Sequence, residues 1–461
     1  MKIRALRILP PLAIARLGSS PAPLENYDIR VPERDPLGFR EIHGALTFVV
    51  DRDSGTIRRA YTPDSVRFRD ERGRVKPVAP FLEVWAEAGG KLVPLTAALL
   101  AGDKLSAADV EWRVQVGNHK VFRRTGQMAD RVDADSGWFS GHHVKALAGK
   151  CANFLPRKTL PFGDVQFIKP TKAFPEIRFR FTPGKGLIYG SNDSRTRSED
   201  VADVVYDSGR GSWSGYTDDN ADPGAIVTNP SGIYANLEDP ATTSRGYLDD
   251  ECDGIVEVRI RGTKLAAFAR IGAGPPDYAP DSFPVRTIAD ELEQVLLGAG
   301  VAAADVSPEW TEEILRRVFE TVRLQNTTVL NGNPVLNGRA ANSMVTQDVR
   351  RGRAEEPIMA PAIVDSLAVR ALHQSVFAAM RSGSAAWFAE VLREFEEVGD
   401  LTNAGRRKMP AMMRGSDGLY LALTRRQHNA VQASGNCQVN AEDPAAATFT
   451  EPAPPKKKVR P

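Results

Sequence analysis

The stretch IVEVRIRGTKLAAFARI, residues 255–271, decides the fold class of this chain. Apolar residues recur along its first half, Gly262-Thr263 occupies a turn position, and a second apolar run continues to Ile271. Two such runs joined by a glycine-containing turn predict a β-hairpin. The stretch that follows, GPPDYAPD at residues 274–281, contains three prolines and two acidic residues, which predicts a rigid turn at the solvent edge.

Other segments of the first three hundred residues carry the same type of signal. Residues 81–95 read as a second hairpin with Gly89-Gly90 in the turn. Residues 110–116 alternate apolar and polar side chains, which is typical of a half-buried strand. Residues 66–69 and 177–181 are also predicted to be strands. This amount of β structure, joined by irregular loops, predicts sandwich-like packing.

From about residue 288 the pattern becomes helical. Thr287 is placed to cap a helix that stops at Gly298. Ser307-Pro308 provides a capping serine followed by proline at the first helical position, so a second helix should begin there. Helices are predicted, in order, at 288–297, 308–325, 361–380, 385–397 and 425–432.

These patterns together predict an α+β protein. Residues 1–285 should form a β-rich, sandwich-like domain with long loops, and residues 286–434 a mainly helical region. Residues 435–461 are rich in proline and lysine, which predicts a disordered tail. A first strand that enters the core is favoured over a signal peptide for residues 1–18, because Arg7 and two prolines interrupt the apolar stretch.

Charge and cysteine content narrow the class of protein. A net charge of +2 gives no field that would favour nucleic acid or a membrane surface. No apolar run approaches the roughly 20 residues that a membrane-spanning helix requires. The three cysteines, Cys151, Cys252 and Cys437, are widely spaced, so they predict neither a disulfide framework nor a zinc site. A cytoplasmic protein without nucleic-acid or membrane partners is therefore expected.

Two clusters are the candidate metal ligands. His142-His143 lies near Cys151, but neighbouring residues on a strand point to opposite faces, so polar loop residues are favoured over a metal site. The acidic run at residues 249–254 lacks the spacing of a helix-loop-helix calcium site. A solvated turn before the strand at Ile255 is favoured over a cation site. No metal site is predicted, and the common nucleotide-binding and hydrolase motifs do not occur in the sequence.

Two further segments are candidate interaction surfaces. Residues 191–253 are rich in Gly, Ser, Asp and Asn, with Trp213 and Tyr216 among them. The region is predicted to be either a long ordered loop on which these aromatics pack or a mobile surface excursion. Packing under the loop is favoured over a recognition surface formed by Trp213 and Tyr216. Lys456 to Lys458 are either a solvated charge run, which is favoured, or a site for anionic partners.

Five segments, taken in order, resemble the LodA-like family of lysine-ε-oxidases and glycine oxidases. They include ILPPLAIARLGSS, VRFRDERGRVK, VEWRVQVGNHK, YLDDECDGIV and MPAMMRGSDG with LTRRQ. No single segment is specific, but their order extends over most of the chain. The segments lie at residues 8–20, 66–86, 110–120, 247–256 with 274–281, and 409–427.

The resemblance implies a β-rich fold with a helical part and, in active members, a cysteine tryptophylquinone. This cofactor is formed from a cysteine and a tryptophan of the same chain and oxidises amines, releasing hydrogen peroxide. A flavoprotein partner assists its maturation. In the family the cofactor cysteine lies well beyond the LTRRQ-type helix and the tryptophan lies further on. Here only Cys437 follows that helix, and no tryptophan follows Trp387.

The preferred hypothesis is a LodA-like scaffold that has lost the quinone and acts as a non-catalytic binding or structural protein, with oligomerisation possible. The alternative is an amino-acid or primary-amine oxidase with an unusual cofactor pair, for which Cys437 and Trp387 are the candidates. A flavoprotein maturation partner is expected only under this alternative. Without a cofactor role, Cys437 is expected to be a free thiol and Trp387 a core residue on a helix face.

Overall fold

The structure is a computed structural model with an α+β fold. It describes residues 2–32, 40–192, 202–211, 213, 248–276, 280–321, 374–376, 378–379, 386–398, 408–410 and 422–435. The chain divides into two compact units. Unit 1 comprises Met1–Asp28 and Ile42–Tyr278, and unit 2 comprises Ile29–Glu41 and Ala279–Pro461. The predicted division at residues 285 and 286 did not include the early segment Ile29–Glu41 in the second unit.

The first sheet of unit 1 has six strands, all joined by antiparallel pairing. Its order is β1-β7-β13-β12-β11, and β8 pairs with β7. The predicted hairpin with Gly89-Gly90 in its turn is confirmed by the β7–β8 pair. The strands are β1 (Ile3–Leu9), β7 (Phe81–Ala88), β8 (Lys91–Pro94), β11 (Lys145–Gly149), β12 (Leu160–Ile168) and β13 (Arg178–Pro183).

The second sheet of unit 1 has five strands in the order β10-β9-β17-β18-β2. The hairpin predicted from residues 255–271 is confirmed as the β17–β18 pair. On its outer side β18 pairs in parallel with β2, where Ile271 lies opposite Ala13. The strands are β2 (Leu12–Arg16), β9 (Val110–Asn118), β10 (Val132–Asp135), β17 (Cys252–Ile260) and β18 (Ala266–Gly274).

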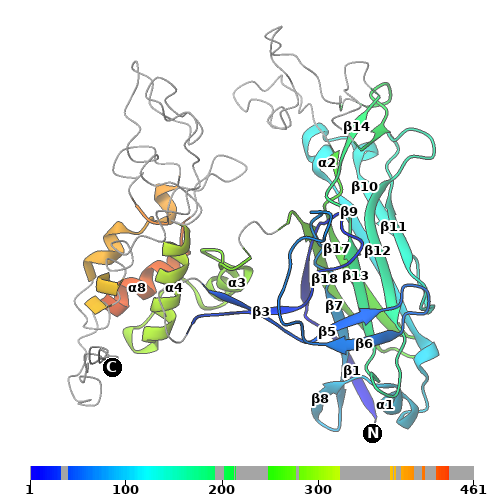
Figure 1. Ribbon diagram of the computed structural model, residues 1–461, viewed down its shortest axis with the longest axis horizontal. Helices are drawn as coiled ribbons and strands as arrows, with labels where there is room; N and C mark the ends of the chain where they lie inside the picture. Colours follow the sequence, from blue (N-terminus) through cyan, green and yellow to red (C-terminus); the bar gives the residue numbers. More distant parts are fainter. Residues whose placement is uncertain are drawn as a thin grey trace, which may run out of the picture. The chain divides into compact units, whose positions relative to one another are not determined.

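The core of unit 1 contains side chains from both sheets. Trp112 of β9 is fully buried and stacks on Phe179 of β13, with ring centroids 4.7 Å apart. Buried and less buried residues alternate along β7, β9 and β13, because successive side chains of a strand point to opposite faces. Figure 1 shows strands of the two sheets running alongside one another. Burial of aromatic and β-branched side chains between them is the main stabilising contribution.

Shorter elements complete unit 1. Residues 66–69 were predicted to be a strand, and this was wrong: only Arg69 pairs, in an isolated bridge with Val75 across the turn. The additional strands are β5 (Thr47–Val50), β6 (Ile57–Tyr61), β14 (Ile188–Ser191), β15 (Asp203–Tyr206) and β16 (Leu248–Asp249). The strands β3 (Tyr27–Arg30) and β4 (Glu41–Gly44) pair with each other, and each contains residues assigned to both units. The helices are α1 (Ala97–Gly102), η1 (Ala107–Asp109), α2 (Lys120–Thr125) and η2 (Met128–Asp130).

Unit 2 begins its helices where the sequence predicted. Thr287 and Ser307 accept backbone N–H groups of the first turns of α3 and α4, as expected of N-caps. The helix predicted at 385–397 is instead two 3₁₀ helices, and most of the one predicted at 361–380 lies outside the described residues. The elements are α3 (Ile288–Leu297), η5 (Ala303–Asp305), α4 (Pro308–Glu320), η9 (Ala386–Val391), η10 (Phe395–Glu397) and α8 (Arg425–Gly435).

Unit 2 holds Arg40, from its early segment, as a buried cation. The Arg40 Nε donates to Glu320 Oε1 at 2.5 Å and its Nη2 to Glu313 Oε1 at 3.0 Å. The guanidinium also lies 4.4 Å above the Phe283 ring. Burial raises the pKa of Glu320, and the ion pair and hydrogen bond with Arg40 oppose this shift. Within the described residues no helix is long and apolar enough to span a bilayer.

Candidate functional site

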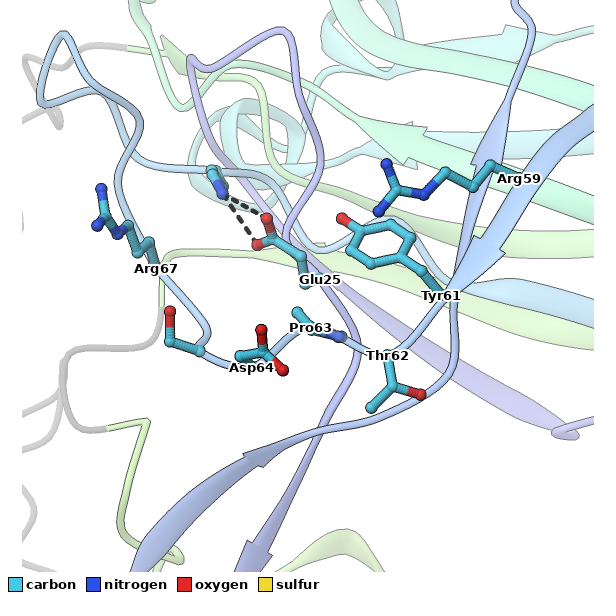
Figure 2. Close-up of a pocket in the computed structure, with 9 residues that line it drawn as sticks. Glu25, Arg59, Tyr61, Thr62, Pro63, Asp64 and Arg67 are labelled. Carbon is cyan, nitrogen blue, oxygen red and sulfur yellow. Dashed lines mark hydrogen bonds and ion pairs between the residues drawn. The ribbon is translucent and has the colours of Figure 1, made fainter.

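A polar hollow of about 430 Å³ in unit 1 is the candidate binding site (Figure 2). It lies beside β6 and the loop that follows this strand. Figure 2 shows Glu25 in the middle, with Arg67 on one side and Arg59 with Tyr61 on the other. The lining residues are Glu25, Arg59, Tyr61, Thr62, Pro63, Asp64, Ser65, Arg67 and Lys76.

Local backbone geometry brings these residues together. After β6 the backbone at Pro63 passes close to Gly44. A Cβ atom at position 44 would lie only 2.0 Å from the Pro63 carbonyl oxygen, so only glycine allows the two backbone segments to come this close. Beyond it the chain doubles back through the turn at residues 70–73, and the N–H of Lys76 donates to the Phe68 carbonyl at 3.0 Å. Because the chain reverses at this turn, Arg67 on one side of it and Lys76 on the other both line the hollow.

The charges in the hollow are unevenly paired. Lys76 Nζ donates to both Glu25 carboxylate oxygens at 2.9 Å, so these two charges largely neutralise each other. Arg59 lies over the Tyr61 ring with 4.1 Å between the guanidinium carbon and the ring centroid, which orients its donors. Among the described residues neither Arg59 nor Arg67 has an ion-pair partner. Asp64 is the one other acidic residue in the lining.

This arrangement can bind an anionic group. Guanidinium groups present several donors in a plane and pair with two oxygens of a carboxylate or phosphate. Two such groups face the same space, and hydroxyls of Thr62 and Ser65 in the lining can donate to a ligand. This site was not predicted, because its residues form no sequence motif and two of its charged residues, Glu25 and Lys76, come from segments outside residues 59–67.

An apolar cleft of about 200 Å³ shares Lys76 with the hollow. Tyr27 and Phe68 meet there edge to face, with ring centroids 5.5 Å apart. Pro276 lines the cleft, and Arg16 Nη1 donates to the Pro275 carbonyl at 3.5 Å. The first residues of the 274–281 stretch therefore form a wall of the cleft, and residues 277–279 lie outside the described part.

The acidic run at residues 249–254 is not the solvated turn that was predicted. Asp250 is fully buried, and both of its carboxylate oxygens accept the N–H of Gly186, at 3.1 and 3.0 Å. Burial raises its pKa to about 6, although backbone N–H groups of residues 185–187 oppose this shift. Asp249 and Glu251 instead pair with Lys120. The sequence could not reveal this burial, because the partners come from distant segments.

A second buried carboxylate, Asp130, was not predicted as a site residue. Its Oδ1 accepts from Tyr206 Oη at 2.6 Å and from Asn153 Nδ2 at 2.7 Å, while Oδ2 accepts from Thr125 Oγ1 at 2.6 Å. Each of its oxygens is therefore satisfied. The group stabilises the fold and offers no free acceptor to a ligand.

The predicted histidine and cysteine candidates do not converge. His142 Nδ1 lies 3.0 Å from the Phe167 carbonyl, and burial lowers the pKa of this histidine. Burial also raises the pKa of Cys151, to about 11, and that of Cys252, so both thiols stay protonated. In the described ranges no group of three or more His, Cys, Asp or Glu residues is arranged to hold a metal ion.

The other sequence candidates are only partly described. Cys437, Tyr216 and the lysines at 456–458 lie outside the described residues, and so does the side chain of Trp387, whose backbone belongs to η9. Trp213 is buried, and its backbone N–H donates to Tyr206 Oη at 3.4 Å. Trp213 therefore packs in the core of unit 1 and does not form an exposed recognition surface, while residues 214–247 of the loop lie outside the described residues.

Comparison with known proteins adds no relative: neither a protein-family model nor a curated protein matches this chain.

Proposed function

We propose that this chain is a non-catalytic, LodA-like binding protein that takes a small anionic ligand in the hollow around Glu25 and Lys76. The observation that carries the ligand class is the pair of guanidinium groups, Arg59 and Arg67, without ion-pair partners among the described residues. A ligand with a carboxylate or phosphate group would provide the missing counter-charge.

The scaffold part of the proposal is supported by contacts among the segments that resemble the family. Leu17 N donates to the Gly274 carbonyl at 2.9 Å, and Arg16 exchanges backbone hydrogen bonds with Val78. Asn118 Nδ2 donates to the Asp249 carbonyl at 3.0 Å. Segments that are distant in sequence thus hold one another in unit 1. In this proposal the two large sheets form a family-type sandwich, followed by a helical part.

The loss of the quinone is supported by the chemistry of the described thiols. Formation of a thioether to an indole requires a reactive sulfur, and burial keeps Cys151 and Cys252 protonated. These two residues therefore do not fit the cofactor. The alternative of an amine oxidase depends on Cys437 and Trp387 and stays a prediction.

Ligand binding is tested by calorimetric titration with inorganic phosphate and, separately, with succinate at low ionic strength. The Arg59→Gln/Arg67→Gln variant should bind either probe at least about tenfold more weakly, because each lost charged hydrogen bond contributes about 1.5–3 kcal/mol. Arg4→Gln is the matched control, since Arg4 is exposed on β1 away from the hollow. Absence of binding by both probes, or equal binding by the double variant, would refute the proposal.

A further inference from the structure

The apolar cleft of unit 1 is built from the same chain segments as the hollow. Residues that are neighbours in the sequence divide between the two cavities: Leu24 lines the cleft and Glu25 the hollow. In the same way Phe68 lines the cleft and Arg67 the hollow, while Lys76 lines both. The charged cavity and the apolar cavity are therefore adjacent, and a single ligand with a charged end and an apolar end can occupy both.

Lys76 marks the border between the two environments. Its ammonium group is held in the hollow by Glu25, with 2.9 Å between Nζ and each carboxylate oxygen, and only 11% of the lysine side chain is exposed. The methylene groups of a lysine cover apolar surface while its charge stays in a polar environment. The lining thus changes from charged to apolar along one side chain.

The cleft has the size and the lining of a site for one aromatic ring. Its volume is about 200 Å³, and an apolar cavity of about 150 Å³ is enough to hold benzene. Tyr27 and Phe68 form an edge-to-face pair in its wall, and a third ring can extend such a pair in the same geometry. Val78 and Pro276 add apolar surface. Ile14, also in the lining, is 40% exposed, so a ring can enter from solvent.

The charges of the hollow determine the other end of the ligand. Three basic residues, Arg59, Arg67 and Lys76, and two acidic residues, Glu25 and Asp64, line the hollow, so the net charge of its lining is +1. One carboxylate balances this charge, whereas a phosphate monoester carries about two negative charges at neutral pH. The planar guanidinium groups of the two arginines also match the two oxygens of a carboxylate.

We propose that the hollow and the cleft together bind an aromatic carboxylate, with the carboxylate at Arg59 and Arg67 and the ring in the cleft. This inference rests on the proposed function, because the hollow must bind the anionic group, and it adds the aromatic part of the ligand. The ring gains affinity by leaving water for an apolar site, and the charge fixes its orientation. 3-Phenylpropionate, in which a short methylene linker joins the ring to the carboxylate, is a probe with both ends.

Saturation-transfer difference NMR on the full chain, at low ionic strength, compares the binding of 3-phenylpropionate, propionate and succinate. We expect 3-phenylpropionate to bind at least about tenfold more tightly than propionate, because it alone has a ring to bury in the cleft. Arg59→Gln/Arg67→Gln should weaken the binding of all three probes. Phe68→Ala should weaken 3-phenylpropionate and leave succinate unchanged. Phe268→Ala is the matched control, since Phe268 is 64% exposed on β18 and lines neither cavity.

A second variant covers the case in which Phe68→Ala disturbs the packing of Tyr27. Ile14→Trp enlarges an exposed side chain that lines the cleft, so it should remove the advantage of 3-phenylpropionate over propionate without changing succinate binding. Equal affinities of the two monocarboxylates, or an advantage that persists in both variants, would overturn the aromatic assignment, while succinate binding would still support the anion site. Absence of binding by all three probes would refute this inference and the anion site together.

Discussion

The buried carboxyl of Asp250 predicts a specific dependence of stability on pH. Asp250 has no exposed surface, and burial raises its pKa from 3.8 to about 6. Between these two values the folded chain keeps the proton on Asp250 while the unfolded chain releases it. The free energy of unfolding therefore falls as the pH rises through this interval. Below 3.8 and above about 6 the group adds no further slope.

The size of this effect follows from the two pKa values. Their difference corresponds to about 3 kcal/mol in the free energy of unfolding, fully expressed above pH 6. Asp250→Asn has no such proton. Its amide loses acceptor bonds from the Gly186 N–H, which shifts its stability by a constant amount at every pH. Relative to the parent chain, the variant should therefore gain about 2 kcal/mol between pH 4 and pH 7, because part of the effect is already present at pH 4.

Urea unfolding followed by tryptophan fluorescence, at half-unit intervals from pH 4 to pH 7, measures this difference. Taking variant minus parent at each pH cancels the contribution of every other titrating group. Asp253→Asn is the matched control, because Asp253 is exposed three residues further along the same run. A difference between Asp250→Asn and the parent that does not change across this interval would show that the carboxyl is not protonated by burial.

Three further predictions concern packing and the cofactor. Arg40→Ala should lower the free energy of unfolding by about 3–5 kcal/mol in urea unfolding, because Glu320 is left as a buried unpaired charge. Adding Glu320→Gln to Arg40→Ala should restore part of this lost stability. Equal losses in the single and the double variant would contradict this reasoning. Trp112→Ala should lower the free energy of unfolding by about 3–5 kcal/mol in the same measurement, since the side chain is fully buried between the sheets. A loss below about 1 kcal/mol would contradict the burial of Trp112 in the core. The purified chain should have its encoded mass and release no peroxide from amino acids. A mass changed by both a cross-link to Cys437 and oxygenation of an indole, together with peroxide release, would favour the oxidase.

Local sequence signals were sufficient to locate many of the strands and helices. Turn glycines located both hairpins, and the caps Thr287 and Ser307 located the starts of two helices. These features depend on residues that are close in sequence, so the physics that produces them is visible there. The failure at residues 66–69 has the opposite cause: a strand needs a partner, and only Arg69 finds one, in a single bridge.

The candidate site could not be predicted because its chemistry is non-local. Glu25 and Lys76 become a pair only after the chain has folded back, and Arg59 and Arg67 are ordinary surface residues in the sequence. The same limit applies to Asp250, which reads as one acid among several until Gly186 is seen beside it.

The early segment Ile29–Glu41 makes the order of synthesis important. On the ribosome Arg40 emerges long before α4, which carries Glu313 and Glu320, and β2 emerges long before its partner β18. During most of translation, therefore, Arg40 lacks its carboxylate partners on α4 and β2 lacks its partner strand β18. A truncated product that starts at residue 279 would contain Glu313 and Glu320 without Arg40. Expression of residues 279–461 alone should therefore give an unstable fragment.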